Sequence, residues 1–261
     1  MAGLSDREFV RLDVEDSIAH VTLDRPPVNA LSIPLYRDIA SAFGEIDQRT
    51  DEIHVAILTG AGRAFCAGRD LKVAGTEDPD ERAKWVKAAL GSIYHCAVPV
   101  VGAVNGAAVG AGLVAAISCD VLVAAENAFF VMPEIDAGGN PSIAALLRGL
   151  NQFQARGLAF LGERHTADDF YRMGIVRAVL PPEQLLPEAM RLAGILAAKD
   201  PLTLRMAKWS ANEVEALFSN FEQAYRAIES RVSAVTMKTD SAKNAAQEFA
   251  DKRGPLANRQ Y

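Results

Sequence analysis

The sequence is poor in the residues that build metal centres and disulfide frameworks. It has three cysteines, Cys66, Cys96 and Cys119, and four histidines in 261 residues. The cysteines are widely spaced and odd in number, so they match neither a zinc-ligand pattern nor a set of disulfides. The sequence therefore predicts no metal site.

Long apolar runs and basic clusters are also scarce. The longest apolar stretch, about residues 98–117, is broken by Pro99, Asn105 and four glycines, which is typical of strands, turns and a short helix rather than a membrane span. The N-terminal segment has early acidic residues and lacks the apolar core of about 7–15 residues found in signal peptides. The net charge of −6 argues against a nucleic-acid surface, although a local patch can still bind a small anion. We therefore expect a cytoplasmic protein that binds neither nucleic acid nor membranes.

The first 140 residues alternate between β-rich and helical patterns. Such a succession is typical of an α/β core. Ser32 and Pro34 mark a helix start, because serine favours the N-cap and proline the first turn. The expected strands are residues 9–12, 18–23, 55–59, 98–104, 121–124 and 129–131, and the expected helices are 32–49, 80–95 and 110–118.

After Pro141 the pattern becomes helical, with a single candidate strand at 176–180. The best boundary signal is Lys199-Asp200-Pro201, because proline starts helices and ends preceding ones. We therefore expect a spiral α/β core over residues 1–199 and a helical region over 200–261. The expected helices are residues 142–161, 183–199, 201–213, 216–236 and 240–252.

Three segments have the composition of a reactive site: Arg63–Lys72, Asn105–Gly112 and Met132–Asp136. In the first, Gly68 allows the backbone to approach a ligand closely. The second is a glycine-rich turn entering a helix, and a helix N-terminus offers N–H groups to a developing oxyanion. Glycine spacing alone favours the simpler explanation that these residues permit tight turns and packing.

Taken together and in this order, the three segments resemble the two oxyanion-hole motifs and the acid/base motif of the enoyl-CoA hydratase/isomerase (crotonase) superfamily. Leu23–Leu31 and Phe249–Pro255 resemble further signatures, so the likeness spans essentially the whole chain. The resemblance implies a crotonase-like spiral of strand–strand–helix units with a helical C-terminal trimerisation part. It also implies an acyl-CoA substrate from fatty acid metabolism, no tightly bound cofactor, and a homotrimer or a dimer of trimers.

Carried over position by position, the resemblance assigns the oxyanion donors to the backbone N–H groups of Arg69 and Ala111. The Arg69 side chain has two further roles open to it, contact with a CoA phosphate or with an acidic acyl tail. The expected substrate contacts are Ala30, Leu31, Ala67, Gly68, Asp70, Leu71, Lys72, Gly110, Val114, Phe249 and Lys252, the last two from a neighbouring subunit.

The hydratases of this superfamily have two catalytic glutamates, and this sequence matches only one. Glu134 aligns with one of them, whereas Val114 stands where the other is expected, one helical turn after Ala111. Valine cannot transfer a proton, so the pair of carboxylates that would hold water is missing. We expect Glu134, with apolar neighbours such as Phe130, to have a raised pKa and to act alone. Double-bond isomerisation is then the simplest reaction, and hydrolysis, decarboxylation or carbon–carbon cleavage of a CoA ester stay open.

The sequence leaves further alternatives. Asp136 is a candidate substitute for the second carboxylate, which would make the protein a true enoyl-CoA hydratase. Asn140 either hydrogen-bonds the acyl group or organises the turn before the following helix. A catalytically inactive CoA- or RNA-binding homologue is an alternative of another class, although the acidic composition and Glu134 argue against it. A serine peptidase on the same fold lacks a Ser–His pair on these motifs.

Overall fold

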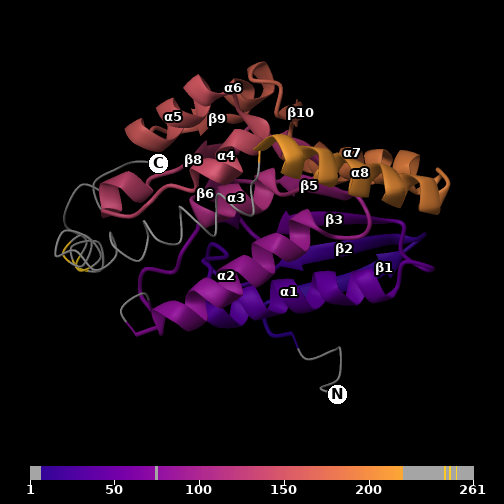
Figure 1. Cartoon of the computed structure of the whole chain (residues 1–261), viewed down its shortest axis with the longest axis horizontal. Coiled ribbons are helices and arrows are strands. Elements are labelled where there is room, and N and C mark those ends of the chain that lie inside the picture. Colours follow the sequence, from indigo (N-terminus) through magenta and orange to yellow (C-terminus); the bar gives the residue numbers. More distant parts are fainter. Residues whose placement is uncertain (1–6, 74–75, 220–243, 245–246, 248–250, 252–261) are drawn as a thin grey trace.

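The computed structural model describes residues 7–73, 76–219, 244, 247 and 251. These residues form two β-sheets with helices packed around them (Figure 1). Within this part of the chain, no helix is long and apolar enough to cross a membrane. Phe249 and Lys252, predicted as substrate contacts, lie outside it.

A six-stranded sheet forms the centre of the molecule. In order across the sheet its strands are β1 (Val10–Glu15), β2 (Ile18–Leu23), β3 (Val55–Gly60), β5 (Val100–Val104), β7 (Val121–Ala125) and β10 (Val176–Leu180). The first two strands form the predicted hairpin, and all other neighbours are parallel. Every residue of β3 and β5 is buried. Strands covered on both faces need apolar residues throughout, which is why these two appear in the sequence as continuous apolar runs.

A smaller sheet takes the second strand of each repeating unit. Its strands are β4 (Ala64–Cys66), β6 (Ala107–Val109), β8 (Phe129–Val131) and β9 (His165–Thr166). Along the chain β4 follows β3, β6 follows β5 and β8 follows β7. Each unit therefore contributes its first strand to the large sheet and its second strand to the small one. Because β4, β6 and β8 are parallel, their C-terminal ends lie at the same edge. This spiral path brings together the loops that follow these three strands.

Helices connect the units and cover the large sheet. They are α1 (Ile33–Gln48), α2 (Pro79–Tyr94), α3 (Ala111–Ile117), the 3₁₀-helix η1 (Glu134–Ala137), α4 (Ile143–Gly149), α5 (Gln152–Leu161), α6 (Ala167–Arg172), α7 (Pro182–Ala197) and α8 (Pro201–Ser219). The inner face of α1 buries Leu35, Ile39 and Phe43 at a spacing of four residues, as an amphipathic helix does. Helix α7 packs against β3, β5 and β7.

Two predicted helices differ from those observed. Residues 142–161 form two helices instead of one, because Asn151 starts α5 anew by accepting hydrogen bonds from the N–H groups of Phe153 and Gln154. The predicted break between 213 and 216 is absent, since α8 continues to Ser219. Strands β6 and β9 and helix α6 were not predicted, because such short elements show little periodic pattern, although the equally short β8 was predicted. The predicted oligomerisation role of residues 200–261 stays a prediction.

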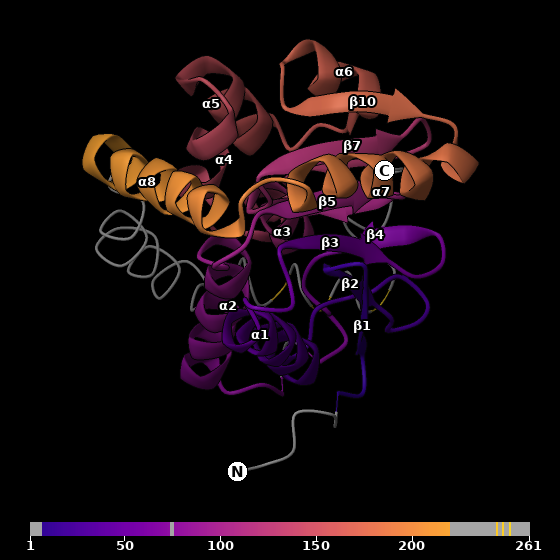
Figure 2. The ribbon, with the colours of Figure 1, turned by 90° about the vertical axis from the view of Figure 1, so that its right-hand side faces the viewer.

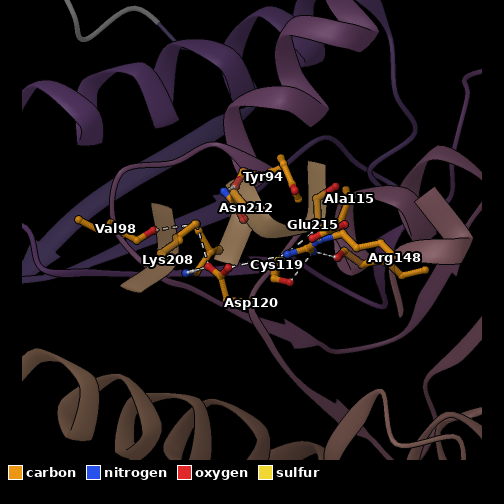
Figure 3. Close-up of polar contacts among 12 residues, drawn as sticks. Tyr94, Val98, Ala115, Cys119, Asp120, Arg148, Lys208, Asn212 and Glu215 are labelled. Atoms are coloured by element: carbon orange, nitrogen blue, oxygen red, sulfur yellow. Dashed lines mark hydrogen bonds and ion pairs between the residues drawn. The ribbon is translucent and has the colours of Figure 1, made fainter. Parts of the chain in front are cut away.

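Helix α8 lies at the left side of the ribbon in Figure 2, and polar side chains anchor it to the core. The buried Lys208 ammonium lies 2.7 Å from Asp120 Oδ2 and donates to the Val98 carbonyl at 3.0 Å. One turn later, Asn212 donates to the Tyr94 carbonyl at 3.2 Å (Figure 3). These contacts join α8 to α2 and to the segments flanking β5 and β7.

A second polar contact explains why α8 has no break near residue 214. Arg148 of α4 lies 3.3 Å from the carboxylate of Glu215, and its guanidinium stacks 4.6 Å from the centre of the Tyr94 ring (Figure 3). Glu215 reaches Arg148 only if α8 stays helical from Lys208 onward, because residues seven apart share one face of a helix. Tertiary contacts therefore decide the length of this helix.

Asn29 fixes the loop between β2 and α1 onto β4. Its backbone has a positive φ of 54° and its side chain is almost fully buried. The side-chain amide donates to the carbonyls of Ala64 and Phe65 at 2.9 and 3.2 Å, and its oxygen accepts from the N–H of Arg25 at 2.9 Å. This one side chain therefore satisfies backbone groups on two segments beside the site.

We expect Asn29→Ala to lower the free energy of unfolding by about 3 kcal/mol, because buried carbonyls lose their donor and alanine is strained at positive φ. Asn29→Gly loses the same hydrogen bonds without the strain, so it should lose about 1 kcal/mol less than the alanine variant. Urea unfolding of the three proteins measures both differences. Equal stability of all three would show that this side chain is not a structural link.

Candidate active site

The loop after β4 lies alongside the segment that precedes α1. Leu31 N–H donates to the Gly68 carbonyl at 2.7 Å, and Asp70 N–H donates to the Leu31 carbonyl at 2.9 Å, so Leu31 and Arg69 form a parallel bridge. Ala67 N–H donates to Val28 at 3.0 Å, which extends the pairing by one step. The structure thus brings Leu31 together with the predicted contacts of the 67–70 loop.

Asp70 makes the side-chain hydrogen bonds that hold this loop in place. Its carboxylate binds Arg25 Nη2 at 2.8 Å and accepts the Lys72 N–H at 3.0 Å. Arg25 also donates to the Ala30 carbonyl at 2.7 Å. Arg25 was not among the predicted site residues, although it lies in the segment Leu23–Leu31 that resembles a family signature. Leu71 is half-buried and the Lys72 side chain is exposed at the surface of the same turn.

The loop after β6 approaches the first loop at backbone distance. Gly68 has a positive φ of 78°, and a Cβ atom there would lie 2.5 Å from the Val109 carbonyl oxygen and 3.8 Å from the Ala111 nitrogen. Only glycine fits at such a distance. Ala111 is the first residue of α3, so its N–H has no acceptor within its own helix. The backbones of the predicted donor residues Arg69 and Ala111 therefore belong to two adjoining loops.

Glu134 lies against the second of these loops. Gly110 has a positive φ of 53°, and a Cβ atom on it would collide with Glu134 Oε1. The residue as a whole is half-buried, but its Oε2 atom is buried and has no hydrogen-bond partner among the described residues. Burial raises the pKa of the carboxyl group to about 7. A carboxyl that exchanges a proton near neutral pH thus adjoins Gly110, immediately before Ala111.

Val114 follows one turn later on α3. Its N–H donates to the Gly110 carbonyl at 3.0 Å, and its side chain is almost fully buried. The side chain lines a pocket of about 460 Å³, together with residues of α2 such as Gly91 and Tyr94 and with Ala145 of α4. An apolar wall therefore stands where a second carboxylate would lie. The α2 residues of this wall were not predicted, although their helical spacing along 84–95 is a usable signal.

The remaining predicted residues lie around this centre. Asp136 is in η1, two residues after Glu134, and its N–H donates to the Pro133 carbonyl at 3.0 Å. Asn140 follows Gly139, whose N–H donates to the Glu134 carbonyl at 2.7 Å. The Arg69 side chain is half-buried, and burial together with the nearby Arg82 guanidinium lowers its pKa to about 10, so it stays charged at neutral pH.

Metal-binding groups are not found in the part of the chain that the structure describes. It contains no cluster of three or more histidine, cysteine, aspartate or glutamate side chains that could hold a metal ion. All three cysteines are buried, and burial raises the pKa of each thiol to about 12. They are therefore uncharged thiols at neutral pH.

The chain resembles known proteins along almost its whole length. The sequence profile described as Enoyl-CoA hydratase/isomerase matches residues 13–259. A (7aS)-7a-methyl-1,5-dioxo-2,3,5,6,7,7a-hexahydro-1H-indene-carboxyl-CoA hydrolase from Rhodococcus jostii is 36% identical over 77% of this chain and 79% of its own. A carnitinyl-CoA dehydratase from Salmonella typhi is 34% identical over 95% of this chain and 98% of its own.

A solved structure extends the likeness to three dimensions. An enoyl-CoA hydratase from Mycobacterium avium subsp. paratuberculosis superposes with a TM-score of 0.85 at 27% identity, covering 95% of this chain and 97% of the other. The predicted crotonase-like α/β fold is therefore confirmed. The trimerisation part of that prediction is not addressed by a single chain.

We expect the stability of the protein to report the raised pKa of Glu134. In the unfolded chain this carboxyl ionises near 4.5, and in the folded protein near 7. Its contribution to stability is full below pH 4.5 and is lost as the pH rises through 7, because the folded state then holds a buried charge. Relative to Glu134→Gln, the wild type should lose about 3 kcal/mol of unfolding free energy between pH 4.5 and pH 8.5.

Urea unfolding at a series of pH values measures this difference. The exposed Glu163→Gln variant serves as the matched control and should follow the wild type at every pH. A wild-type curve parallel to that of Glu134→Gln would mean that Glu134 ionises as an ordinary exposed carboxyl does.

Proposed function

The chain belongs to the enoyl-CoA hydratase/isomerase family, and from this premise we propose that it is a one-carboxylate acyl-CoA enzyme. Glu134 moves a proton on the acyl group while the backbone N–H groups of Arg69 and Ala111 hold the thioester enolate oxygen. The observation that carries the proposal is the buried Glu134 carboxyl against Gly110, with Val114 in place of a second carboxylate.

Backbone donors from two loops suit an enolate. The oxygen of a thioester gains negative charge when a proton leaves the neighbouring carbon, and fixed N–H groups stabilise that charge without reorganising. Loss of one such donor typically slows an enzyme by about 10²–10³-fold. The Gly68–Val109 contact supports this role, because it keeps the two loops at a fixed separation.

One carboxyl group near pH 7 suits proton transfer between two carbons. About half of the Glu134 population is ionised at pH 7 if its pKa is about 7. On a 3-enoyl-CoA, the carboxylate takes a proton from C2, and the electron pair moves into the thioester to give a dienolate. The same group returns the proton to C4, so the double bond moves to C2–C3 and nothing is consumed.

The rest of the site accommodates the two ends of such a substrate. We assign the nucleotide end of CoA to the surface at Ala30, Leu71 and Lys72. The buried Leu31 and Asp70 support this surface from beneath, and the Arg25 contacts hold it together. The thioester then lies between Ala67–Gly68 and Gly110–Ala111, and the acyl group extends past Val114 into the 460 Å³ pocket. Coenzyme A enters as part of the substrate and not as a resident cofactor.

Hydrolysis of a bulky CoA ester is the second candidate. It is favoured by the relative named as a hydrolase of a bicyclic indene-carboxyl-CoA and by the apolar pocket beside Val114. Hydration with Asp136 as the substitute acid is the third, because two other relatives are named enoyl-CoA hydratases. Both alternatives place an oxygen atom from water in the product, whereas isomerisation exchanges only hydrogen.

We expect the wild type to move deuterium from heavy water into 3-hexenoyl-CoA without taking up ¹⁸O from labelled water, as mass spectrometry will show. Glu134→Gln should slow this exchange by at least about 100-fold, because the amide cannot accept the proton. A folded Glu134→Gln variant that retained the exchange would disprove the assignment. Uptake of ¹⁸O by the wild type would favour the second or third candidate.

Val114→Glu is the complementary variant. It places a second carboxyl one turn from Gly110, at the position where hydratases of this family carry one. We expect it to gain hydration of crotonyl-CoA, followed by the loss of absorbance of the conjugated thioester. Val114→Gln, which adds similar bulk without an acid, should show no gain.

We further propose that the protein is a homotrimer or a dimer of trimers. Leu202, Met206 and Trp209 form an exposed apolar stripe at i, i+4 and i+7 on α8, with exposed fractions of 57%, 50% and 60%. Light scattering after gel filtration should give three or six times the chain mass of 28.0 kDa. Trp209→Asp should shift the distribution toward the monomer, and a monomeric wild type would contradict the proposal.

A further inference from the structure

One face of α2 forms a wall of the pocket beside Val114. Lys84, Lys87, Gly91 and His95 all line it. They follow one another at spacings of three and four residues, which places them along a single helix face. The pocket is therefore bounded by α2 on one side and by Val114 of α3 on another.

This wall carries positive charge and no compensating acid. Lys84, Lys87 and His95 are the ionisable bases among the lining residues, and no aspartate or glutamate from residues 7–73 and 76–219 lines the pocket. Lys84 and Lys87 make this wall locally positive, although the chain as a whole has a net charge of −6. Helix α2 has its acidic residues, Asp80 and Glu81, only in its first turn.

Two of the acids near this wall are already paired. Glu81 of α2 forms an ion pair with Arg37 of α1. Glu215 contacts Tyr94, which lines the pocket, but Arg148 lies 3.3 Å from its carboxylate. Asp80 lies one turn before Lys84 on α2 but does not line the pocket, and Lys87 has no acid one turn away on this helix.

The inner part of the wall is open and apolar. A Cβ atom at Gly91 would meet no other atom within 4 Å, so this position faces empty space. Val114 and Ala145 form apolar surface opposite, and both are almost fully buried. A chain of methylene groups can enter this part, while its far end meets the exposed lysines.

We propose that this pocket selects acyl-CoA substrates whose acyl group ends in a carboxylate, bound by Lys84 and Lys87. The inference rests on the proposed acyl-CoA site, since it places the acyl group beyond Val114. An apolar channel that ends in ammonium groups favours a dicarboxylic acyl group over a monocarboxylic one of equal length, because only the former brings a charge to the lysines. The preference should weaken with salt, as it does for charges near the surface.

Binding of two saturated CoA esters tests the proposal on the intact protein. Adipyl-CoA and hexanoyl-CoA have six-carbon acyl groups and differ only in the terminal carboxylate. Isothermal titration calorimetry at low salt should show adipyl-CoA binding about tenfold more tightly than hexanoyl-CoA. The double variant K84E/K87E should reverse this order and change hexanoyl-CoA affinity less than about twofold.

Two matched charge variants distinguish effects on binding of the acyl group from effects on binding of the CoA moiety. Lys72→Glu lies on the proposed nucleotide surface and should weaken both esters equally. Lys199→Glu, an exposed lysine at the end of α7, should change neither. If K84E/K87E weakened both esters equally, the lysines would contact CoA phosphates, and the proposal would be wrong. It would also be wrong if the wild type bound hexanoyl-CoA at least as tightly as adipyl-CoA.

Gly91→Leu tests where the acyl group lies. The leucine fills open space, so we expect it to leave the fold intact and to weaken both six-carbon esters at least fivefold while acetyl-CoA binding stays unchanged. Unchanged binding of all three esters would place the acyl group elsewhere and overturn the inference. Failure of the wild type to bind any CoA ester would instead contradict the proposed function, so the two failures are distinguishable.

Discussion

The site depends on how closely three backbone segments approach at one edge of the small sheet. Strands β4, β6 and β8 are parallel, so the loops that follow them begin side by side. The missing side chain of Gly68 leaves room for the Val109 carbonyl, and that of Gly110 leaves room for the Glu134 carboxyl. A methyl group at either glycine would push two of these segments apart. The proposed donors and the proposed acid/base are therefore positioned by backbone packing.

Burial of one carboxyl group links the chemistry to stability. Glu134 Oε2 is buried without a partner among the described residues, and the resulting rise in its pKa makes the ionised form costly to the folded protein. The apolar Val114 beside the site adds no charge that would offset this cost. The same desolvation gives the group a pKa near neutrality, as a proton shuttle requires. Burial of Glu134 therefore lowers the free energy of unfolding at neutral pH, and the same burial gives the protein a carboxyl group that exchanges a proton there.

The pocket beside Val114 has walls from distant parts of the chain. Helix α2 supplies one side, α3 another and the start of α4 a third, while α8 holds Tyr94 and Arg148 through Asn212 and Glu215 (Figure 3). Contacts at α8 therefore fix the shape of a pocket that α8 itself does not line within the described residues.

Elements with a strong repeating pattern could be predicted from the sequence. The runs at 55–59 and 98–104 predicted β3 and β5, because buried parallel strands need uninterrupted apolar residues. Helices α1 and α2 were predicted within one residue of their observed ends, α1 with its start marked by Ser32 and Pro34 and α2 from a charged helical pattern. The short strand β6 was not predicted, because pairing with its neighbours β4 and β8, and not a local pattern, makes it a strand.

For the site, the order of residues along the chain and their arrangement in space supplied different information. The sequence alone shows that position 114 is a valine and position 134 a glutamate. The resemblance to known motifs was enough to indicate that these two positions matter. The contact between Glu134 and Gly110, the link from Arg25 to Asp70, and the lysines of α2 at the pocket became visible only in the folded chain. The physical reason is that desolvation and charge pairing depend on neighbours 24 to 45 residues away, whose positions no local pattern records.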